Sequence, residues 1–263
     1  EALDELVKLL LCREYLEATG QSLKLTAVGP THETLEKSIG HFGLEDYKIG
    51  RLALSEPSIA RMWRLLEDAN SEYGDLDLGS HALRSFIGRD SRRGLGIFLT
   101  PENVVETIID YIGVRPGARV LDLAAGSGTF LKAYLQRQPR NCTIVAAEKN
   151  PKIMLLARIN LIPFERLANV EYRLIDSLQH IPDTDLYDVI VTNPPFGVST
   201  SVTDDIRSSY ETVRVLAGSS SYTTIPSELL FLEKCLKLLK PGGQLVIVLP
   251  KSIATNLSLQ AAR

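Results

Sequence analysis

The sequence predicts an α/β fold, with a doubly wound, mostly parallel sheet preceded by a helical domain. Short apolar runs typical of buried strands recur in the second part of the chain and end in polar residues. Segments with helical spacing separate those runs, which is the pattern of βαβ units. The first part shows helical spacing without strand alternation. We therefore expect a helical domain over residues 1–92 and the α/β domain over residues 93–263.

The predicted helical domain contains two helices with clear sequence signals. Apolar residues recur at helical spacing over residues 3–15. A second helix is predicted over residues 55–66, with Pro57 tolerated in its first turn. Residues 71–79 are typical of a loop, and a short capped helix is expected over residues 80–87.

A glycine-rich turn follows the first predicted strand of the sheet, residues 119–122. Gly126 and Gly128 suit a backbone that passes close to a ligand or adopts positive φ. Free N–H groups at the start of the next helix add a positive partial charge, which is typical of a nucleotide-cofactor loop. A dinucleotide-binding loop would have a third glycine where this sequence has Leu131, so NAD is disfavoured.

Acidic residues end this strand and the next two. Asp122 is placed to meet a cationic group such as an amino group, although it is also compatible with a polar strand end. Glu148, after strand 142–148, can accept hydrogen bonds from both hydroxyls of a ribose. Asp176, after strand 170–175, can accept a hydrogen bond from an adenine amino group. Because charged groups are rarely buried without a partner, ligand binding at the carboxyl edge explains all three.

The tetrapeptide Asn193-Pro194-Pro195-Phe196, called the acceptor motif below, directly follows the apolar run 187–192. The Pro-Pro pair fixes two successive φ angles and keeps the preceding residue out of the α region. It would hold the Asn193 side chain and the Pro194 carbonyl as two acceptors for an exocyclic NH₂ group. Phe196 offers an apolar face on which a planar ring could stack for ~1–3 kcal/mol. The alternative interpretation is a strand that ends in a proline-rich turn.

The chain after the acceptor motif has three predicted parts. Residues 197–225 are Ser/Thr-rich without a clear amphipathic period, which favours a mobile lid or a nucleic-acid-facing loop, with a merely flexible insertion as the alternative. A helix is expected over residues 229–239, with Phe231 in the core. A buried strand is expected over residues 244–250.

Composition is that of a globular protein: 263 residues, 44% hydrophobic and 23% charged. There is no apolar run of about 18 residues and no secretory leader, so we expect a cytoplasmic protein without a membrane span. The three cysteines are widely spaced in apolar patterns, which favours reduced core residues, and the four histidines lack ligand spacing. We therefore expect no metal.

A net charge of −3 is unusual for a nucleic-acid-binding surface, which normally gains affinity from lysine and arginine. The strongest local basic cluster consists of Arg84, Arg89, Arg92 and Arg93, and a solvated face is its alternative role. If DNA is the substrate, we expect much of the binding affinity to come from polypeptide outside this sequence or from a partner subunit.

Taken together, these motifs resemble the S-adenosylmethionine-dependent amino methyltransferases, and more narrowly the adenine-N6 DNA methyltransferases of bacterial restriction-modification systems. The segment Phe98-Leu99-Thr100-Pro101 is similar to that family's additional cofactor motif, whose loop closes over the methionine end. Its position ahead of the glycine loop and the acceptor motif is the gamma arrangement, shared by type I modification subunits and fused type II enzymes. The resemblance covers residues 96–250.

The resemblance implies a Rossmann-like methyltransferase sheet that binds S-adenosyl-L-methionine through Phe98, Thr100, Pro101, Asp122, Ala124, Gly126, Gly128, Glu148 and Asp176. It also implies direct methyl transfer to N6 of a flipped adenine, with Asn193, Pro194, Pro195 and Phe196 as catalytic residues. Such sheets ordinarily add a final antiparallel strand pair, so we expect the chain that stops at Arg263 to be truncated.

Several alternatives stay open. Transfer to a protein glutamine or to an RNA amino group uses similar motifs, and a non-catalytic module that binds DNA or a partner is a third possibility. The expected partners are DNA and a specificity subunit, a nuclease or a missing target-recognition domain. The helical domain could cover the cofactor cleft or contact one of those partners.

Overall fold

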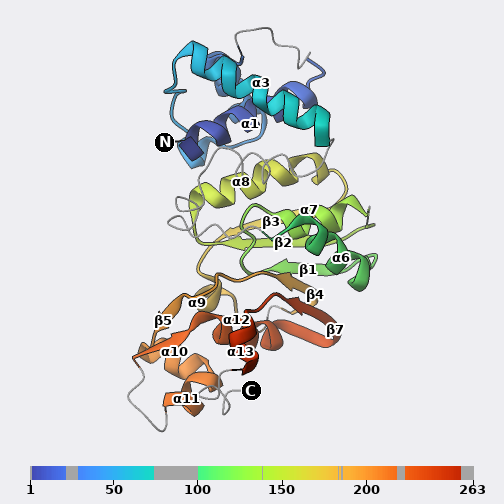
Figure 1. Cartoon of the computed structure of the whole chain (residues 1–263). Helices are drawn as coiled ribbons and strands as arrows, with labels where there is room; N and C mark the ends of the chain where they lie inside the picture. Colours follow the sequence, from blue (N-terminus) through green and yellow to red (C-terminus); the bar gives the residue numbers. More distant parts are fainter. Residues whose placement is uncertain are drawn as a thin grey trace.

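The computed structural model describes residues 2–21, 29–73, 100–137, 139–182, 184, 186–217 and 223–255. The N-terminal helices, the sheet with its flanking helices, and a small α/β insertion follow one another along the molecule (Figure 1). Some sequence predictions lie outside the described residues. They are the loop over 71–79 beyond residue 73, the short helix over 80–87, the basic cluster Arg84, Arg89, Arg92 and Arg93, the domain boundary at residue 92, and Phe98 and Leu99. Residues 71–73 of the predicted loop belong to a helix.

The central sheet has five parallel strands in the order β3-β2-β1-β4-β7. Its order changes direction at β1, which has β2 on one side and β4 on the other. Ligands of doubly wound sheets bind at such a switch point, outside the carboxyl ends of the strands. The predicted fold class is thus confirmed, with these strand bounds: β1 Arg119–Asp122, β2 Thr143–Glu148, β3 Asn169–Leu174, β4 Tyr187–Thr192 and β7 Leu239–Ile247.

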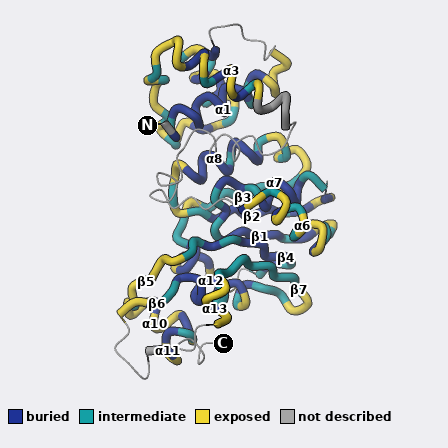
Figure 2. Tube along the Cα trace, viewed as in Figure 1, coloured by how far each residue is buried: buried dark blue, intermediate teal, exposed yellow. Residues whose placement is uncertain are grey.

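Successive side chains of the inner strands point to opposite faces of the sheet, so each face has its own core. Val120 packs with helices α6 (Glu102–Ile112) and α7 (Thr129–Gln136). Its neighbour Leu121 packs with α12 (Ser227–Leu238) and α9 (Ser177–His180). A tube coloured by burial shows the inner strands as dark blue segments between these layers (Figure 2).

Three further helical segments complete the α/β part. Helix α8 (Pro151–Leu161) packs against β2 and β3 and matches the expected helix over 151–160, and a 3₁₀ turn, η2 (Ile162–Phe164), follows it. Helix α13 (Lys251–Thr255) follows β7. The expected helix over 229–239 is α12, which begins two residues earlier.

Two of the N-terminal helices match the predicted ones, α1 (Ala2–Ala18) and α3 (Glu56–Tyr73). Helix α2 (His32–His41) was not predicted, although Thr31 supplies the capping box that begins it, and a 3₁₀ turn, η1 (Glu45–Tyr47), follows. The three helices share one apolar core with α8. The sheet part and the helical part are therefore continuous in packing.

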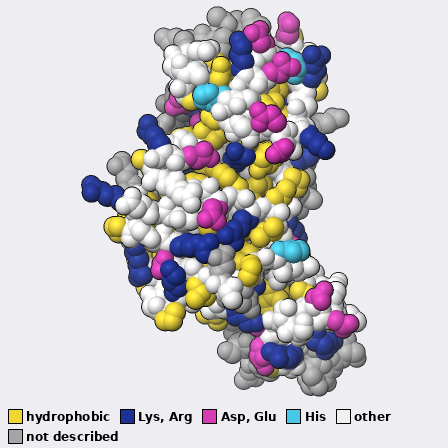
Figure 3. Space-filling model, turned by 180° about the vertical axis from the view of Figure 1, so that it is seen from behind, with side chains coloured by type: hydrophobic (Ala, Val, Ile, Leu, Met, Phe, Trp, Pro, Cys, Tyr) yellow, Lys and Arg dark blue, Asp and Glu magenta, His cyan; other side chains and the backbone are white. Residues whose placement is uncertain are grey.

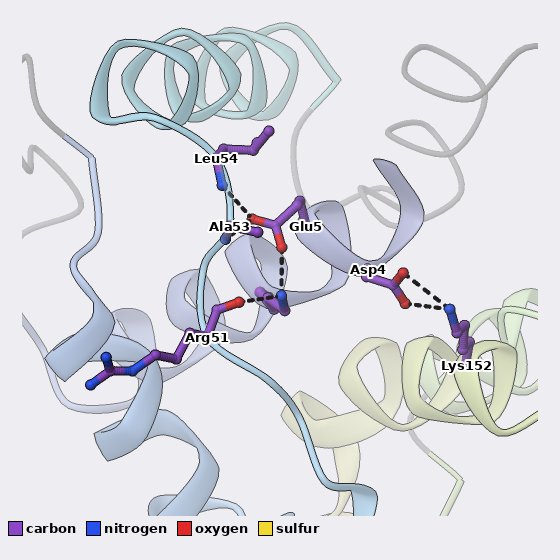
Figure 4. Close-up of polar contacts among 7 residues, drawn as sticks. Asp4, Glu5, Arg51, Ala53, Leu54 and Lys152 are labelled. Carbon is purple, nitrogen blue, oxygen red and sulfur yellow. Dashed lines mark hydrogen bonds and ion pairs between the residues drawn. The ribbon is translucent and has the colours of Figure 1, made fainter. Parts of the chain in front are cut away.

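Polar contacts reinforce that packing (Figure 4). Asp4 of α1 pairs with Lys152 of α8 at 2.8 Å. The buried carboxylate of Glu5 accepts hydrogen bonds from Lys8 and from the backbone amides of Ala53 and Leu54. Both oxygens of the buried carboxylate thus have donors. Two of the donors lie in the segment before α3, so the contacts fix that segment against α1.

The segment after the acceptor motif differs from its prediction as a loop. Its described residues form strand β5 (Ser199–Ser201), helices α10 (Asp204–Ser209) and α11 (Glu211–Ala217), and strand β6 (Thr224–Pro226), which pairs antiparallel with β5. The buried side chains Ile206, Tyr210, Val213 and Leu216 join the core beneath α12. The two helices are too short for a periodic pattern to stand out in the sequence, which explains the wrong prediction.

None of the helices described above has the length and apolar character needed to cross a bilayer.

Candidate functional site

A cavity of about 350 Å³ opens at the carboxyl ends of the central strands, at the switch point between β1 and β4. Its volume lies within the range typical of small-molecule sites. The predicted site residues that line it are Ala124, Gly126, Glu148, Asp176, Asn193 and Pro195. The glycine loop, two of the predicted acidic residues and the acceptor motif therefore meet in one place.

The glycine loop has the backbone conformation that its sequence predicts. Gly126 and Gly128 have φ of +56° and +80°, in the left-handed region that favours glycine. A side chain at Gly128 would also meet the backbone of Ala157 in α8 at 3.4 Å. Gly128 therefore allows the loop to approach α8 closely, while Gly126 lines the cavity.

Glu148 ends β2 and organises the cofactor side of the cavity. One carboxylate oxygen accepts from the Gly126 amide at 3.2 Å, and the other accepts from the Asn150 amide at 2.9 Å. Each carboxylate oxygen has two lone pairs, so both keep capacity to accept a hydroxyl. Asn150 in turn caps α8 by accepting from the Lys152 amide.

Asp122 lies beneath the cavity and is not part of its wall. Its Oδ1 accepts from the Ala124 amide at 3.0 Å and from the Thr192 hydroxyl at 2.7 Å. Its Oδ2 is buried and has no hydrogen-bond partner among the described residues. Burial raises the pKa of the carboxyl to about 7, the two hydrogen bonds oppose that shift, and the nearby Glu148 adds to it.

Asp176 follows β3 and lines the cavity, but it also has a structural role. Its Oδ1 accepts from the Leu178 amide at 3.1 Å and so caps α9. A carboxylate that caps a short helix is held in a defined orientation at the cavity wall. Contact with an adenine amino group stays a prediction.

Asn193 follows β4, and its two amide atoms have different surroundings. The Nδ2 group donates to the Thr100 hydroxyl at 2.7 Å. The Oδ1 atom is buried and has no hydrogen-bond partner among the described residues. A buried amide oxygen without a donor is unfavourable by about 1–3 kcal/mol. A ligand N–H group that donates to this oxygen would remove that cost.

The neighbours of Asn193 in the acceptor motif are placed unequally. Pro195 lines the cavity and Pro194 is buried. Phe196 is half-buried and is not among the lining residues, so stacking on a planar ring stays a prediction. The motif is thus a rigid edge of the cavity with Asn193 at its start.

The upstream motif meets the acceptor motif in space. Thr100 is buried against Asn193, and Pro101 is the residue before the first turn of α6. Phe98 lies outside the described residues. The hydrogen bond between Thr100 and Asn193 joins two motifs that are 93 residues apart in the sequence.

Several lining residues were not predicted. Phe231 was assigned to the core, and it both joins a core cluster and lines the cavity. Asn150 and Ile153 were missed although they lie two and five residues after Glu148, and this position alone could have suggested them. Ser227 and Thr200 had no signal, because only the folded insertion brings them to the wall.

The cavity fits S-adenosylmethionine. Glu148 lines the cavity and offers acceptors for the two ribose hydroxyls, whereas contact of the buried Asp122 carboxyl with the amino group of the methionine part stays a prediction. Ile153, Leu178 and Phe231 provide apolar wall for a planar base. Within the described residues there is no cluster of His, Cys, Asp or Glu that could hold a metal ion.

Comparison with known proteins identifies the family of the chain. The family model described as N-6 DNA methylase matches residues 81–257. A tRNA1(Val) (adenine(37)-N6)-methyltransferase of Aeromonas salmonicida is 32% identical over 142 residues, which are 53% of this chain and 54% of that protein. The type I restriction enzyme StySPI methylase subunit of Salmonella potsdam is 24% identical over 70% of this chain and 36% of that subunit.

A release factor glutamine methyltransferase of Koribacter versatilis is also similar, at 28% identity over 43% of this chain and 40% of its own length. The chain thus spans about a third to just over half of the length of these relatives. Among solved structures, the type I restriction-modification methyltransferase subunit of Streptococcus thermophilus has the same fold, with a TM-score of 0.61 at 19% identity over 96% of this chain and 57% of that one. The chain belongs to the N-6 DNA methylase family, and its cofactor is S-adenosylmethionine.

Proposed function

We propose that this methyltransferase transfers a methyl group to the N6 amino group of adenine in DNA. The observation that carries the proposal is the amide of Asn193. Its nitrogen donates to Thr100, and its buried oxygen has no donor among the residues that the structure describes. An amino group attached to a planar base supplies that donor, and the family model that matches the chain is that of N-6 DNA methylases.

The chemistry needs little beyond positioning. S-adenosylmethionine supplies an electrophilic methyl group on a sulfonium. Asn193 Oδ1 and the carbonyl of Pro194 accept the two N–H bonds of the target and turn the nitrogen lone pair away from the ring toward the methyl group. As the new N–C bond forms, the S–CH₃ bond would break to release S-adenosylhomocysteine and one proton would pass from the nitrogen to water, so that the methylated amine is neutral. A covalent enzyme intermediate is not needed.

The strand order supports a proposed order of the two ligands along the sheet. Glu148 and Asp122 belong to β2 and β1, whereas Asn193 follows β4 on the other side of the switch point. A cofactor held at β1 and β2 would present its methyl group toward β4. The flipped adenine then occupies the Asn193 side, with Phe196 as the proposed stacking surface.

We further propose that the chain acts in a restriction-modification system with a partner that recognises DNA sequence. The similarity to a type I methylase subunit supports this role. Lys and Arg side chains lie interspersed with Asp and Glu on the face shown in Figure 3. The net charge is −3. A specificity subunit, a nuclease or a further domain that contacts phosphates would supply the affinity that this chain's charge does not.

Transfer to adenine in RNA is the second candidate, favoured by the similarity to a tRNA adenine-N6 methyltransferase. The chemistry at Asn193 would be the same, because both targets are the same base. Transfer to a protein glutamine, suggested by the third relative, also presents a planar NH₂ group. The target must therefore be identified by experiment.

Labelled S-adenosylmethionine identifies the target directly. The protein, with its specificity partner when one is encoded beside it, is incubated with unmethylated plasmid DNA, unmodified tRNA and release factor in separate reactions. Mass spectrometry of the digested products locates the label. We expect N6-methyladenine in DNA, and label confined to tRNA or to glutamine would contradict the proposal.

A further inference from the structure

The backbone that leaves the acceptor motif is held by the start of α12. The Gly197 amide donates to Oε1 of Glu228 at 2.7 Å, and the Val198 carbonyl accepts from the Ser227 amide at 2.9 Å. The hydroxyls of Thr200 and Ser227 lie 2.8 Å apart within hydrogen-bonding distance. Three successive contacts thus tie the exit of the motif to one helix end.

Glu228 is an unusual residue for a merely structural anchor. The residue is only 3% exposed. Its second carboxylate oxygen, Oε2, is buried and has no hydrogen-bond partner among the described residues. A buried carboxylate with a single neutral donor is costly for folding. Among the described residues the donor that it has is the Gly197 amide, so the buried side chain is held against the exit of the acceptor motif.

Asn193 lies between two such anchors. Thr100 fixes its side chain, and Glu228 fixes Gly197, the residue after Phe196. The intervening Pro194 and Pro195 have restricted φ angles. A displacement of Gly197 should therefore also displace Asn193, because few backbone torsions between them can change to compensate.

We propose that Glu228 is a positioning residue for methyl transfer. By accepting the hydrogen bond from the Gly197 amide, it keeps the acceptor motif, and with it Asn193, in a fixed orientation. The proposal rests on the proposed role of Asn193 in contacting the amino group of the target. Glu228 does not line the cofactor cavity. Its loss should therefore act on the rate of transfer and leave cofactor binding unchanged.

A second carboxylate on α12 provides a matched control. Glu233 accepts from the backbone amides of Glu211 and Thr212 at 2.7 and 2.8 Å. Like Glu228, it ties the insertion to α12 through backbone N–H groups, but it contacts the start of α11 and not the acceptor motif. Replacing each residue by alanine therefore distinguishes loss of the Asn193 orientation from loss of the general attachment of the insertion to α12.

The test compares Glu228→Ala, Glu228→Gln and Glu233→Ala in the whole protein. Turnover is measured at saturating cofactor and target, and cofactor affinity by calorimetry. For Glu228→Ala we expect turnover to fall by at least ~10-fold, since small misplacements of reacting groups cost up to ~100-fold, with cofactor affinity within about twofold. Glu228→Gln should stay within about threefold of wild type, because its amide oxygen accepts the Gly197 N–H. Glu233→Ala should also stay within about threefold.

Hydrogen exchange at the Gly197 amide gives a readout that needs no methyl acceptor. We expect fast exchange in Glu228→Ala and protection in wild type and Glu228→Gln. The proposal is overturned by wild-type turnover in a folded Glu228→Ala protein, by equal loss in Glu228→Gln, or by equal loss in Glu233→Ala. If the wild type methylates RNA or glutamine, the proposed target is wrong, but the ratios between variants test Glu228 on that acceptor equally well.

Discussion

The two sides of the cavity hold their polar groups in different ways. On the proposed cofactor side, Asp122 and Glu148 each accept from a backbone amide two residues further along the chain and also from one remote donor, Thr192 or Gly126. On the proposed acceptor side, Asn193 contacts Thr100, 93 residues earlier, and Gly197 contacts Glu228, 31 residues later. The first side thus combines local turns with tertiary contacts, whereas the contacts described for the second side are tertiary.

This difference has consequences for function. A group that is held partly by its own turn keeps that part of its support as long as the strand and the turn form. A group that is held by remote segments keeps its orientation only while those segments stay packed together. We therefore expect cofactor binding to tolerate changes at Thr100 or Glu228, while methyl transfer should be sensitive to both.

The largest effect is expected from Asn193→Ala. It removes the acceptor for the target amino group, and loss of a comparable preorganised contact lowers turnover by about 10²–10³-fold. Cofactor affinity should change by no more than a few-fold, because the binding groups lie on the other side. Single-turnover kinetics and calorimetry measure the two quantities, and near-normal turnover would remove Asn193 from the mechanism.

The converse pattern is expected from Glu148→Ala. Loss of the hydrogen bonds that the ribose hydroxyls would donate to this charged acceptor should cost ~2–3 kcal/mol, or about 30- to 150-fold in cofactor affinity. Glu148→Gln, which keeps one acceptor oxygen, should be affected less. Calorimetry on samples with native circular dichroism checks this, and wild-type affinity of the alanine variant would show that the ribose assignment is wrong.

Titration distinguishes the two sides, because Asp122 ionises and Asn193 does not. The pKa of Asp122 is about 7 in the folded protein and 3.8 in its ordinary state, so the folded state holds the proton more tightly. Its contribution to stability is fully present below pH 4 and is lost as pH rises through 7. The free energy of unfolding should fall by up to ~1.4 kcal/mol per pH unit across this window from this group alone.

Asp122→Asn should lack that dependence. Denaturant unfolding of both proteins between pH 5 and pH 8 gives the difference, in which contributions from all other groups cancel. Equal slopes for the two proteins would mean that Asp122 has an ordinary pKa.

The smallest effect is expected from Thr100→Val, which removes one hydroxyl of similar shape. Loss of a neutral hydrogen bond of about 1 kcal/mol should slow transfer roughly fivefold by loosening the Asn193 amide. Thr107, whose hydroxyl bonds within α6, is the matched control, and Thr107→Val should leave the transfer rate unchanged. Equal rates for Thr100→Val and wild type would show that the hydroxyl does not hold the amide.

The same division explains what could be predicted from the sequence. The ends of β1, β2 and β4, the positive φ angles of Gly126 and Gly128, and the position of Glu148 follow from short segments, and the structure has them as expected, whereas β7 begins and ends earlier than the predicted strand over 244–250. The contact of Asn193 with Thr100 and that of Gly197 with Glu228 join segments that no local pattern relates. The insertion was wrongly predicted as a loop for the same reason, since its short helices are stabilised by burial against α12.

The most direct test of this account measures the rate of methyl transfer to adenine in DNA at saturating S-adenosylmethionine for Glu148→Ala and Asn193→Ala. If the two sides act separately, saturation restores Glu148→Ala to nearly the wild-type rate, while Asn193→Ala remains slower by about 100-fold or more. A recovery of Asn193→Ala at high cofactor concentration, or a persistent defect in Glu148→Ala, would contradict the separation of cofactor binding from transfer.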